Sequence, residues 1–247
     1  MKIFEIYNFL NTISPFDLSE SWDNCGLILG SFDDDFEDIY LSIDLDLDLV
    51  EKIKSNSLVI THHPLIFSPL KRINFDNFTT KILQIAIKKD IKLISMHTNF
   101  DKTHLNNYVF EQVLGFKTTY KNDFIVEDDV NIDFDELVER VQNRLGLDFI
   151  KFSKSHNEIK KVALTTGSGG SLLDKISADT FLTADIKYHE AMQAKALGIN
   201  LMEIGHYESE KYFGEILSPI MSQYLKKNNL KDIITNSQNP FCYRRTD

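Results

Sequence analysis

The stretch Leu58-Val59-Ile60-Thr61-His62-His63-Pro64 joins a short apolar run to two adjacent histidines and a proline. Consecutive large aliphatic residues predict a strand buried on both faces, as in the sheets of α/β proteins. Neighbouring side chains of a strand point to opposite faces, so His62 and His63 reach one place only if the backbone turns after the strand. Pro64 favours such a turn, because it cannot extend a ladder of hydrogen bonds. Adjacent histidines entering a turn suit a pair of metal ions, although such pairs are often structural.

The segments around this stretch repeat one rhythm, in which short apolar runs alternate with amphipathic segments, and this rhythm is typical of an α/β fold. In the first half we expect helices over residues 2–12, 47–55, 79–89 and 105–114, and strands over 39–45, 58–60 and 91–95. In the second half we expect helices over 133–145, 172–177, 189–197 and 209–226, and strands over 161–165, 180–183 and 201–204.

These segments predict two similar α/β halves, residues 1–125 and 126–247, with an approximate boundary in the polar stretch 117–133. A length of 247 residues fits two ordinary domains or one large one, and the C-terminal segment is left open to pack back on the first half. Each half places polar side chains after two successive strands, which is where open α/β sheets bind ligands. The pattern therefore predicts two units that face one shared site.

Charge and composition limit the possible functions. The 27 Lys and Arg residues against 37 Asp and Glu give a net charge of −10, which disfavours generic nucleic-acid binding. Two cysteines are too few for a disulfide framework or a Cys-rich zinc site. Glu5 interrupts the N-terminus early, and no stretch approaches the roughly 18 apolar residues of a membrane span. We therefore expect a cytoplasmic protein without a membrane segment.

Two further histidines are each followed, four positions later, by a carboxylate: His97 by Asp101, and His206 by Glu210. Residues four apart share one face of a helix, and both pairs lie where an expected strand leads into a helix. A carboxylate that spans two cations also lowers their mutual repulsion. With the paired histidines, these residues predict a metal site. Imidazole and carboxylate ligands without thiolate favour Zn, Fe, Mn, Co or Ni.

A glycine-rich segment, Gly167-Ser168-Gly169-Gly170-Ser171, lies between an expected strand and an expected helix. Backbone amides in such a loop can bind a phosphate, so a nucleotide phosphate is one interpretation. The segment lacks the lysine of a P-loop, and Leu172 stands where the dinucleotide fingerprint needs its third glycine. A tight turn is an equally good interpretation.

Five motifs in order give the sequence a specific resemblance. The motifs are SWDNCGL (21–27), THHP (61–64), HTNFD (97–101), DIKYH (185–189) and GHYESE (205–210). Together they closely resemble the Nif-three-like family, whose bacterial members are labelled GTP cyclohydrolase 1 type 2 homologues. The resemblance runs from about residue 22 to 210. Ala184 departs from it, because glycine is usual there, and the chain is too short for the extra domain that some members carry between the halves.

The resemblance implies that two α/β halves enclose a dinuclear centre with two divalent metal ions per subunit, and that subunits assemble into a homohexameric ring. His97 and His189 would lie beside the ions as residues that orient ligands or transfer protons. Glu210 would bridge the ions. The implied metal ligands are His62, His63, Asp101, His206 and Glu210.

The resemblance also implies a function, a metal-dependent hydrolase that opens the imidazole ring of GTP and releases formate. The loop Gly167, Ser168, Gly169 and Gly170 would then hold the triphosphate. Two other hypotheses stay open at this point. One is a non-catalytic metal-binding scaffold or regulatory ring, and the other is a ring around nucleic acid, which the net charge of −10 disfavours.

Overall fold

The computed structural model describes residues 1–235 and 237–244, and the chain divides into two compact units. The first unit contains Met1–Thr103 and Phe213–Gln238, and the second contains His104–Tyr212 and the described residues from Asn239 onward. This division differs from the boundary expected near residue 125. The chain passes to the second unit about 20 residues earlier, and a C-terminal segment returns to the first unit.

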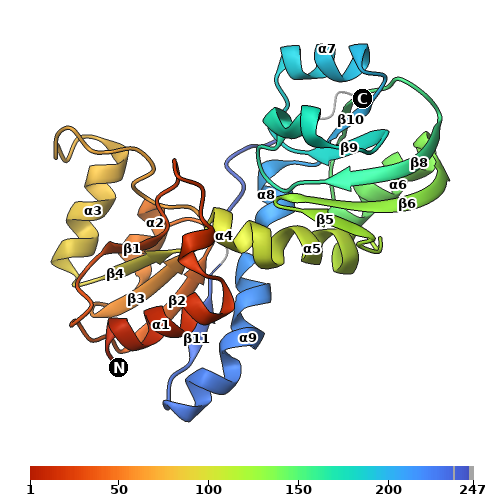
Figure 1. Cartoon of the computed structure of the whole chain (residues 1–247). Coiled ribbons are helices and arrows are strands. Elements are labelled where there is room, and N and C mark those ends of the chain that lie inside the picture. Colours follow the sequence, from red (N-terminus) through yellow and green to blue (C-terminus); the bar gives the residue numbers. More distant parts are fainter. Residues whose placement is uncertain (236, 245–247) are drawn as a thin grey trace. The chain divides into compact units, whose positions relative to one another are not determined.

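The first unit is built on a five-stranded sheet with the strand order β1-β4-β3-β2-β11 (Figure 1). Strands β11, β2, β3 and β4 run parallel, and β1 pairs antiparallel with β4 at the edge. Every residue of β3 is buried, as predicted for its apolar run. The strands are β1 (Gly26–Leu29), β2 (Asp38–Ser42), β3 (Ser57–Thr61), β4 (Lys92–Ser95) and β11 (Asp232–Ile234).

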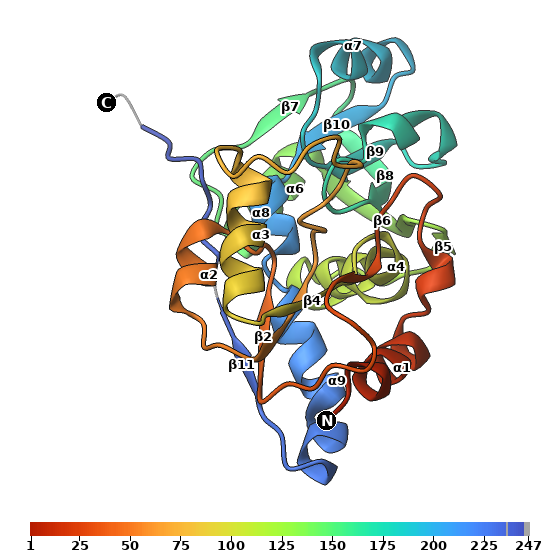
Figure 2. The same ribbon diagram turned by 90° about the vertical axis from the view of Figure 1, so that its left-hand side faces the viewer.

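Neighbouring residues of a strand point to opposite faces of the sheet. Consecutive residues of β2 and β3 are buried, so both faces are covered, and helices lie on each. Tyr40 packs in one apolar cluster with Val50 of α2 and Ile82 of α3, and these two helices lie side by side (Figure 2). The next residue, Leu41, faces Gly214 of α9. The helices of this unit are α1 (Ile3–Ile13), the 3₁₀ turn η1 (Phe16–Leu18), α2 (Leu47–Lys52), α3 (Phe78–Lys88), α4 (Thr98–Phe100) and α9 (Phe213–Lys227).

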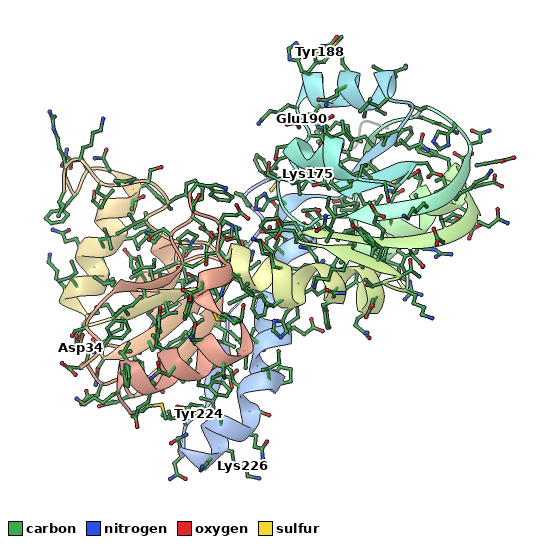
Figure 3. All side chains as sticks on the ribbon, viewed as in Figure 1. Asp34, Lys175, Tyr188, Glu190, Tyr224 and Lys226 are labelled. Carbon is green, nitrogen blue, oxygen red and sulfur yellow. The ribbon has the colours of Figure 1, made fainter. Side chains whose placement is uncertain are left out.

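Helix α1 confirms the amphipathic pattern predicted over residues 2–12, since Ile3, Ile6 and Leu10 are fully buried on one face. Its partly exposed face meets α9, where Tyr224, labelled in Figure 3, stacks on Phe9 with ring centroids 4.0 Å apart. These contacts join the N-terminal helix to the returning C-terminal segment.

The second unit contains a six-stranded sheet with the order β5-β6-β8-β9-β10-β7. Strands β8, β9 and β10 run parallel, and the other pairings are antiparallel. The polar stretch 117–133, expected as a boundary, instead forms the hairpin β5–β6, because half of β6 is buried and its Glu127 pairs with Lys161 of β8. The strands are β5 (Tyr120–Asn122), β6 (Ile125–Asp133), β7 (Lys151–Ser153), β8 (Glu158–Leu164), β9 (Thr180–Thr183) and β10 (Asn200–Glu203).

The helix expected over residues 209–226 is two helices, α8 and α9, and they separate where the chain leaves the second unit. Helix α6 ends at Gly146 in the left-handed conformation, as its sequence predicts. No helix among the described residues has the length and apolar character needed to cross a membrane. The remaining helices are the π-helical η2 (Asp101–Leu105) and η3 (Val109–Val113), α5 (Asn106–Tyr108), α6 (Phe134–Leu145), the 3₁₀ helix η4 (Gly170–Lys175), α7 (Tyr188–Ala196) and α8 (His206–Glu210).

Candidate metal centre

In the first unit, the backbone turns directly after β3 and brings two imidazoles together. The amides of His62 and His63 donate to the carbonyls of Ser42 (3.1 Å) and Ile43 (2.9 Å), and Thr61 Oγ1 donates to the carbonyl of His63 (2.8 Å). The two rings consequently lie with centroids 5.0 Å apart. The turn predicted from the His-His-Pro sequence is confirmed.

His97 joins this pair from the end of β4. A ring nitrogen of each of His62, His63 and His97 lies within 4.8 Å of the other two, which is close enough for shared coordination of an ion. The ring of His97 stands edge-on to both neighbours, with interplanar angles of 77° and 80°. The sheet therefore collects three imidazoles at the carboxyl ends of two parallel strands, where ligand sites of α/β proteins lie.

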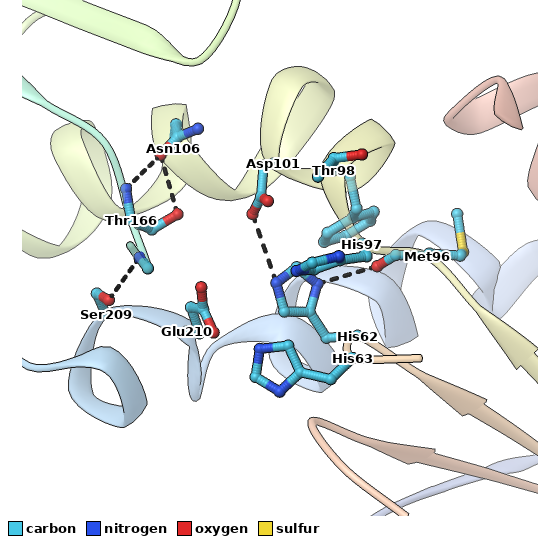
Figure 4. A network of polar contacts seen from close by, with 12 residues as sticks. His62, His63, Met96, His97, Thr98, Asp101, Asn106, Thr166, Ser209 and Glu210 are labelled. Atoms are coloured by element: carbon cyan, nitrogen blue, oxygen red, sulfur yellow. Dashed lines mark hydrogen bonds and ion pairs between the residues drawn. The ribbon is translucent and has the colours of Figure 1, made fainter. Parts of the chain in front are cut away.

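Asp101 adds a carboxylate to the same cluster. Its amide donates to the carbonyl of His97 at 3.0 Å, which places the two residues one helical turn apart, as their spacing predicts. Asp101 is 7% exposed, and its Oδ1 lies 3.5 Å from Nε2 of His62 (Figure 4). We refer to His62, His63, His97 and Asp101 as the first ligand group.

The second unit carries its own pair on α8, which follows β10. Nε2 of His206 lies 2.9 Å from Oε2 of Glu210, whose residue is 2% exposed. The imidazole and carboxylate thus share one face of the helix, as their spacing predicts. We refer to His206 and Glu210 as the second ligand group.

Gly167 makes room for the carboxylate of Glu210. A Cβ atom on Gly167 would lie 2.2 Å from Oε1 of Glu210, and the residue has φ +60°. The loop is held by Asn106, whose Oδ1 accepts from the amide (2.7 Å) and hydroxyl (2.9 Å) of Thr166 (Figure 4). The amide of Gly167 donates to Oγ of Ser209 at 3.2 Å. This part of the glycine-rich segment therefore helps to position the carboxylate of Glu210.

The other predicted residues of the second unit lie in the rest of the glycine-rich segment and on α7. The amide of Gly169 donates to Oγ1 of Thr183 at 2.9 Å, while Ser168 is exposed. His189 is exposed on α7, and its ring centroid lies 5.4 Å from that of the exposed Tyr188, which is labelled in Figure 3. Phosphate binding by Gly167, Ser168, Gly169 and Gly170 and the role of His189 stay predictions.

Each histidine of the two ligand groups has an oxygen acceptor on Nδ1. Donation from Nδ1 leaves the lone pair on Nε2, and this arrangement is typical of histidines that bind metal ions. The sequence interpretation missed the three carboxylates among these acceptors, Asp23, Asp44 and Asp185, although Asp23 lies within the SWDNCGL motif and Asp185 within the DIKYH motif. The pairs are His62 with the carbonyl of Met96 (2.9 Å), His63 with Asp44 (2.9 Å), His97 with Asp23 (2.9 Å) and His206 with Asp185 (2.6 Å).

The side chain of Asp23 is fully buried, yet its surroundings keep it ionised. Burial by itself raises the pKa of this carboxyl, but hydrogen bonds from His97, Thr98 and Cys25, together with the charge of His97, lower the pKa well below its usual range. The amide of Thr98 donates to Oδ2 of Asp23 at 3.1 Å, and the hydroxyl of Thr98 donates at 2.5 Å. A buried carboxylate is therefore fixed behind His97.

The fold and the site define a two-unit α/β protein with histidine and carboxylate groups after parallel strands, and comparison with known proteins gives its family. Residues 1–240 match the family model Duf34/NIF3 (NGG1p interacting factor 3), and the chain belongs to this family. The resemblance to Nif-three-like proteins predicted from the motifs is confirmed.

Similar proteins cover almost the whole chain. A Campylobacter jejuni protein named GTP cyclohydrolase 1 type 2 homolog is 44% identical over 244 residues, covering 98% of this chain and 100% of the relative. A Helicobacter pylori protein named GTP cyclohydrolase 1 type 2 is 41% identical over 238 residues, covering 96% of each. The crystal structure of a Staphylococcus aureus hypothetical protein superimposes with a TM-score of 0.85 at 26% identity, covering 99% of each chain.

Proposed function

We propose that this protein is a metal-dependent hydrolase that holds two divalent metal ions and opens the imidazole ring of GTP with release of formate. The observation that carries the proposal is the set of Nδ1 acceptors, since all four histidines of the ligand groups have one. Structural histidines need no such uniform arrangement, whereas metal-binding histidines depend on it for orientation and basicity.

The donor set fits two divalent ions. The ions would be held by His62, His63, Asp101, His206 and Glu210. Each ligand group by itself has too few donors for two ions, so the proposal requires both groups to bind the same pair. Neutral imidazoles and two buried carboxylates, without a thiolate, suit Zn, Fe, Mn, Co or Ni.

Two bound divalent ions would supply Lewis acidity and a water-derived nucleophile at neutral pH. The chain's residues supply the rest. His97, held by Asp23, would donate or accept a proton during ring opening, and His189 is the second candidate for this task. Ring opening adds one water at C8 of guanine and breaks a C–N bond to leave a formamide, and a second water releases formate.

The substrate is proposed from the relatives, two of which carry GTP cyclohydrolase 1 type 2 in their names and cover nearly the whole chain. Binding of the triphosphate by the glycine-rich loop would use amides other than those of Gly167 and Gly169, which already donate within the protein. Assembly into a homohexameric ring is also part of the proposal, and light scattering on the purified protein tests it.

Elemental analysis after purification without added metal tests the metal centre, with two ions per chain expected. Glu210→Gln, which keeps the size but removes the charge, should lower the metal content and abolish formate release from GTP. Glu139→Gln, an exposed change on α6, is the matched control. Two ions per chain without formate release would favour a non-catalytic metal-binding scaffold. A metal content near zero would contradict the whole proposal.

A further inference from the structure

Two large aromatic side chains, Trp22 and Phe67, stay exposed beside the first ligand group. Trp22 is 57% exposed and Phe67 is 52% exposed, and their ring centroids lie 5.9 Å apart. Each also lies against His97, at 6.4 Å for the indole and 6.3 Å for the phenyl ring. The three rings form one cluster, and only its imidazole is largely shielded from solvent.

Polar contacts fix this aromatic pair to the histidine. Asp23, the neighbour of Trp22, accepts the hydrogen bond from Nδ1 of His97 (2.9 Å). Nδ2 of Asn24 donates to the carbonyl of Ile66 at 2.6 Å, which joins the loop carrying Trp22 to the loop carrying Phe67. Residues close in sequence to Trp22 and Phe67 are therefore held by hydrogen bonds to buried or partly buried groups, while the two aromatic rings stay exposed to solvent.

We propose that Trp22 and Phe67 bind the planar heteroaromatic ring of the substrate by stacking and hold it beside His97. The reaction is the one given under the proposed function, on which this inference rests. The new element is that Trp22 and Phe67 select the substrate class, which is compounds with a purine-like base. Aromatic side chains stack on nucleobases with little dependence on hydrogen-bond pattern. The planes of the two rings are 51° apart, so a base that stacks on the indole would contact the phenyl ring at a tilt.

The position of the pair favours a small ring over an aliphatic partner surface. Its neighbours Asp23, Asn24 and His97 are polar, and small-molecule sites typically combine aromatic side chains with a few polar groups. The base would also lie next to the imidazole that the proposed function assigns to proton transfer.

The chain has a single tryptophan, so fluorescence excited at 295 nm reports on Trp22 alone. We expect guanosine and GTP to quench this emission saturably, and inorganic triphosphate to leave it unchanged. Phe67→Leu should weaken guanosine binding by about 10-fold, since stacking on one aromatic ring contributes on that order. Phe67→Tyr should retain it. The matched control is Phe78→Leu, because Phe78 is 61% exposed at the start of α3.

Three results would overturn the inference. The first is equal quenching by inorganic triphosphate, and the second is unchanged guanosine affinity in Phe67→Leu. The third is a change of oligomeric state in Phe67→Leu without a change in affinity, which would make the pair an interface between copies. Metal content and formate release, measured on the same samples, distinguish a failure of the stacking inference from a failure of the proposed reaction. Phe67-dependent guanosine binding without formate release supports stacking alone, whereas formate release with an unchanged KM in Phe67→Leu supports the reaction alone.

Discussion

Asp23 accepts a hydrogen bond from Nδ1 of His97 across 74 positions of sequence, at a distance of 2.9 Å. The side chain of Asp23 is fully buried, so it cannot exchange this partner for water without a change of structure. The contact fixes the orientation of the imidazole and leaves Nε2 directed away from Asp23. The aspartate stays charged, so a fixed carboxylate lies behind the imidazole. The pair is thus suited to position His97 beside the proposed metal ions.

Asp23→Asn should separate this positioning role from metal binding. The amide keeps the shape of the side chain but removes the charge behind His97, so we expect two ions per chain to remain. Formate release should fall by about 10- to 100-fold, the range found for partners that orient metal-site histidines. Steady-state kinetics should place the loss in kcat, with KM little changed. A variant that loses metal and activity together would contradict the assignment, since Asp23 would then be needed for the centre itself.

The two thiols should differ sharply in reactivity. Burial raises the pKa of Cys25 to about 11, and the neighbouring carboxylate of Asp23 adds to the effect. Cys242 is exposed. Because the thiolate is the reactive form, a disulfide reagent such as Ellman's reagent at pH 8 should titrate one thiol per folded chain quickly and the second only after denaturation. Cys242→Ser should remove the fast phase, and a fast phase that persists in this variant would show that Cys25 is reactive.

The sequence predicted both ligand groups because their pattern is local. His97 and Asp101, and likewise His206 and Glu210, are four residues apart, and a single helical turn places each pair on one face. The turn after β3 followed from Pro64 in the same way. Helices and strands with a clear apolar period, such as Ile3–Ile13 and Thr180–Thr183, were likewise predictable.

Features that depend on distant partners were not predictable. Asp44 lies near the end of the strand expected over residues 39–45, and only the fold shows that it accepts from Nδ1 of His63. The hairpin β5–β6 was missed because its strands are polar, and the buried Glu127 is tolerated only through Lys161 and Ser177. The hydrophobic pattern of the sequence cannot reveal these contacts, because Lys161 and Ser177 lie 34 and 50 positions from Glu127 along the chain.

The surroundings of Glu127 predict that part of the free energy of unfolding depends on pH in the acid range. Burial by itself raises the pKa of this carboxyl, but Lys161 and the amide and hydroxyl of Ser177 lower the pKa below its usual value. The folded protein therefore binds this proton less readily than the unfolded chain. The stabilisation is fully present above the unfolded pKa, about 4.3, and is lost as the pH falls through the lower folded value.

Glu127→Gln should therefore lower the free energy of unfolding at pH 7 by about 1–3 kcal/mol, the usual effect of disrupting a buried charged hydrogen bond. The difference from wild type should shrink below about pH 4, where the native carboxyl is itself neutralised. Urea unfolding at both pH values measures the change, with Glu139→Gln as the exposed control. A difference that is the same at both pH values would contradict the role of the charge.

Gly167→Ala should show that the glycine-rich loop acts on Glu210. The added Cβ would lie 2.2 Å from Oε1 of Glu210, so the carboxylate must move and metal content should fall below that of wild type. Gly198→Ala is a matched control, because Gly198 has a similar positive φ (+74° against +60°) and no atom within 4 Å of the added Cβ. Backbone strain of about 1 kcal/mol should lower the stability of both variants, while only Gly167→Ala should also lose metal. Equal metal content in the two variants would mean that the loop tolerates the methyl group without moving Glu210, and the close packing would then have no bearing on the metal centre.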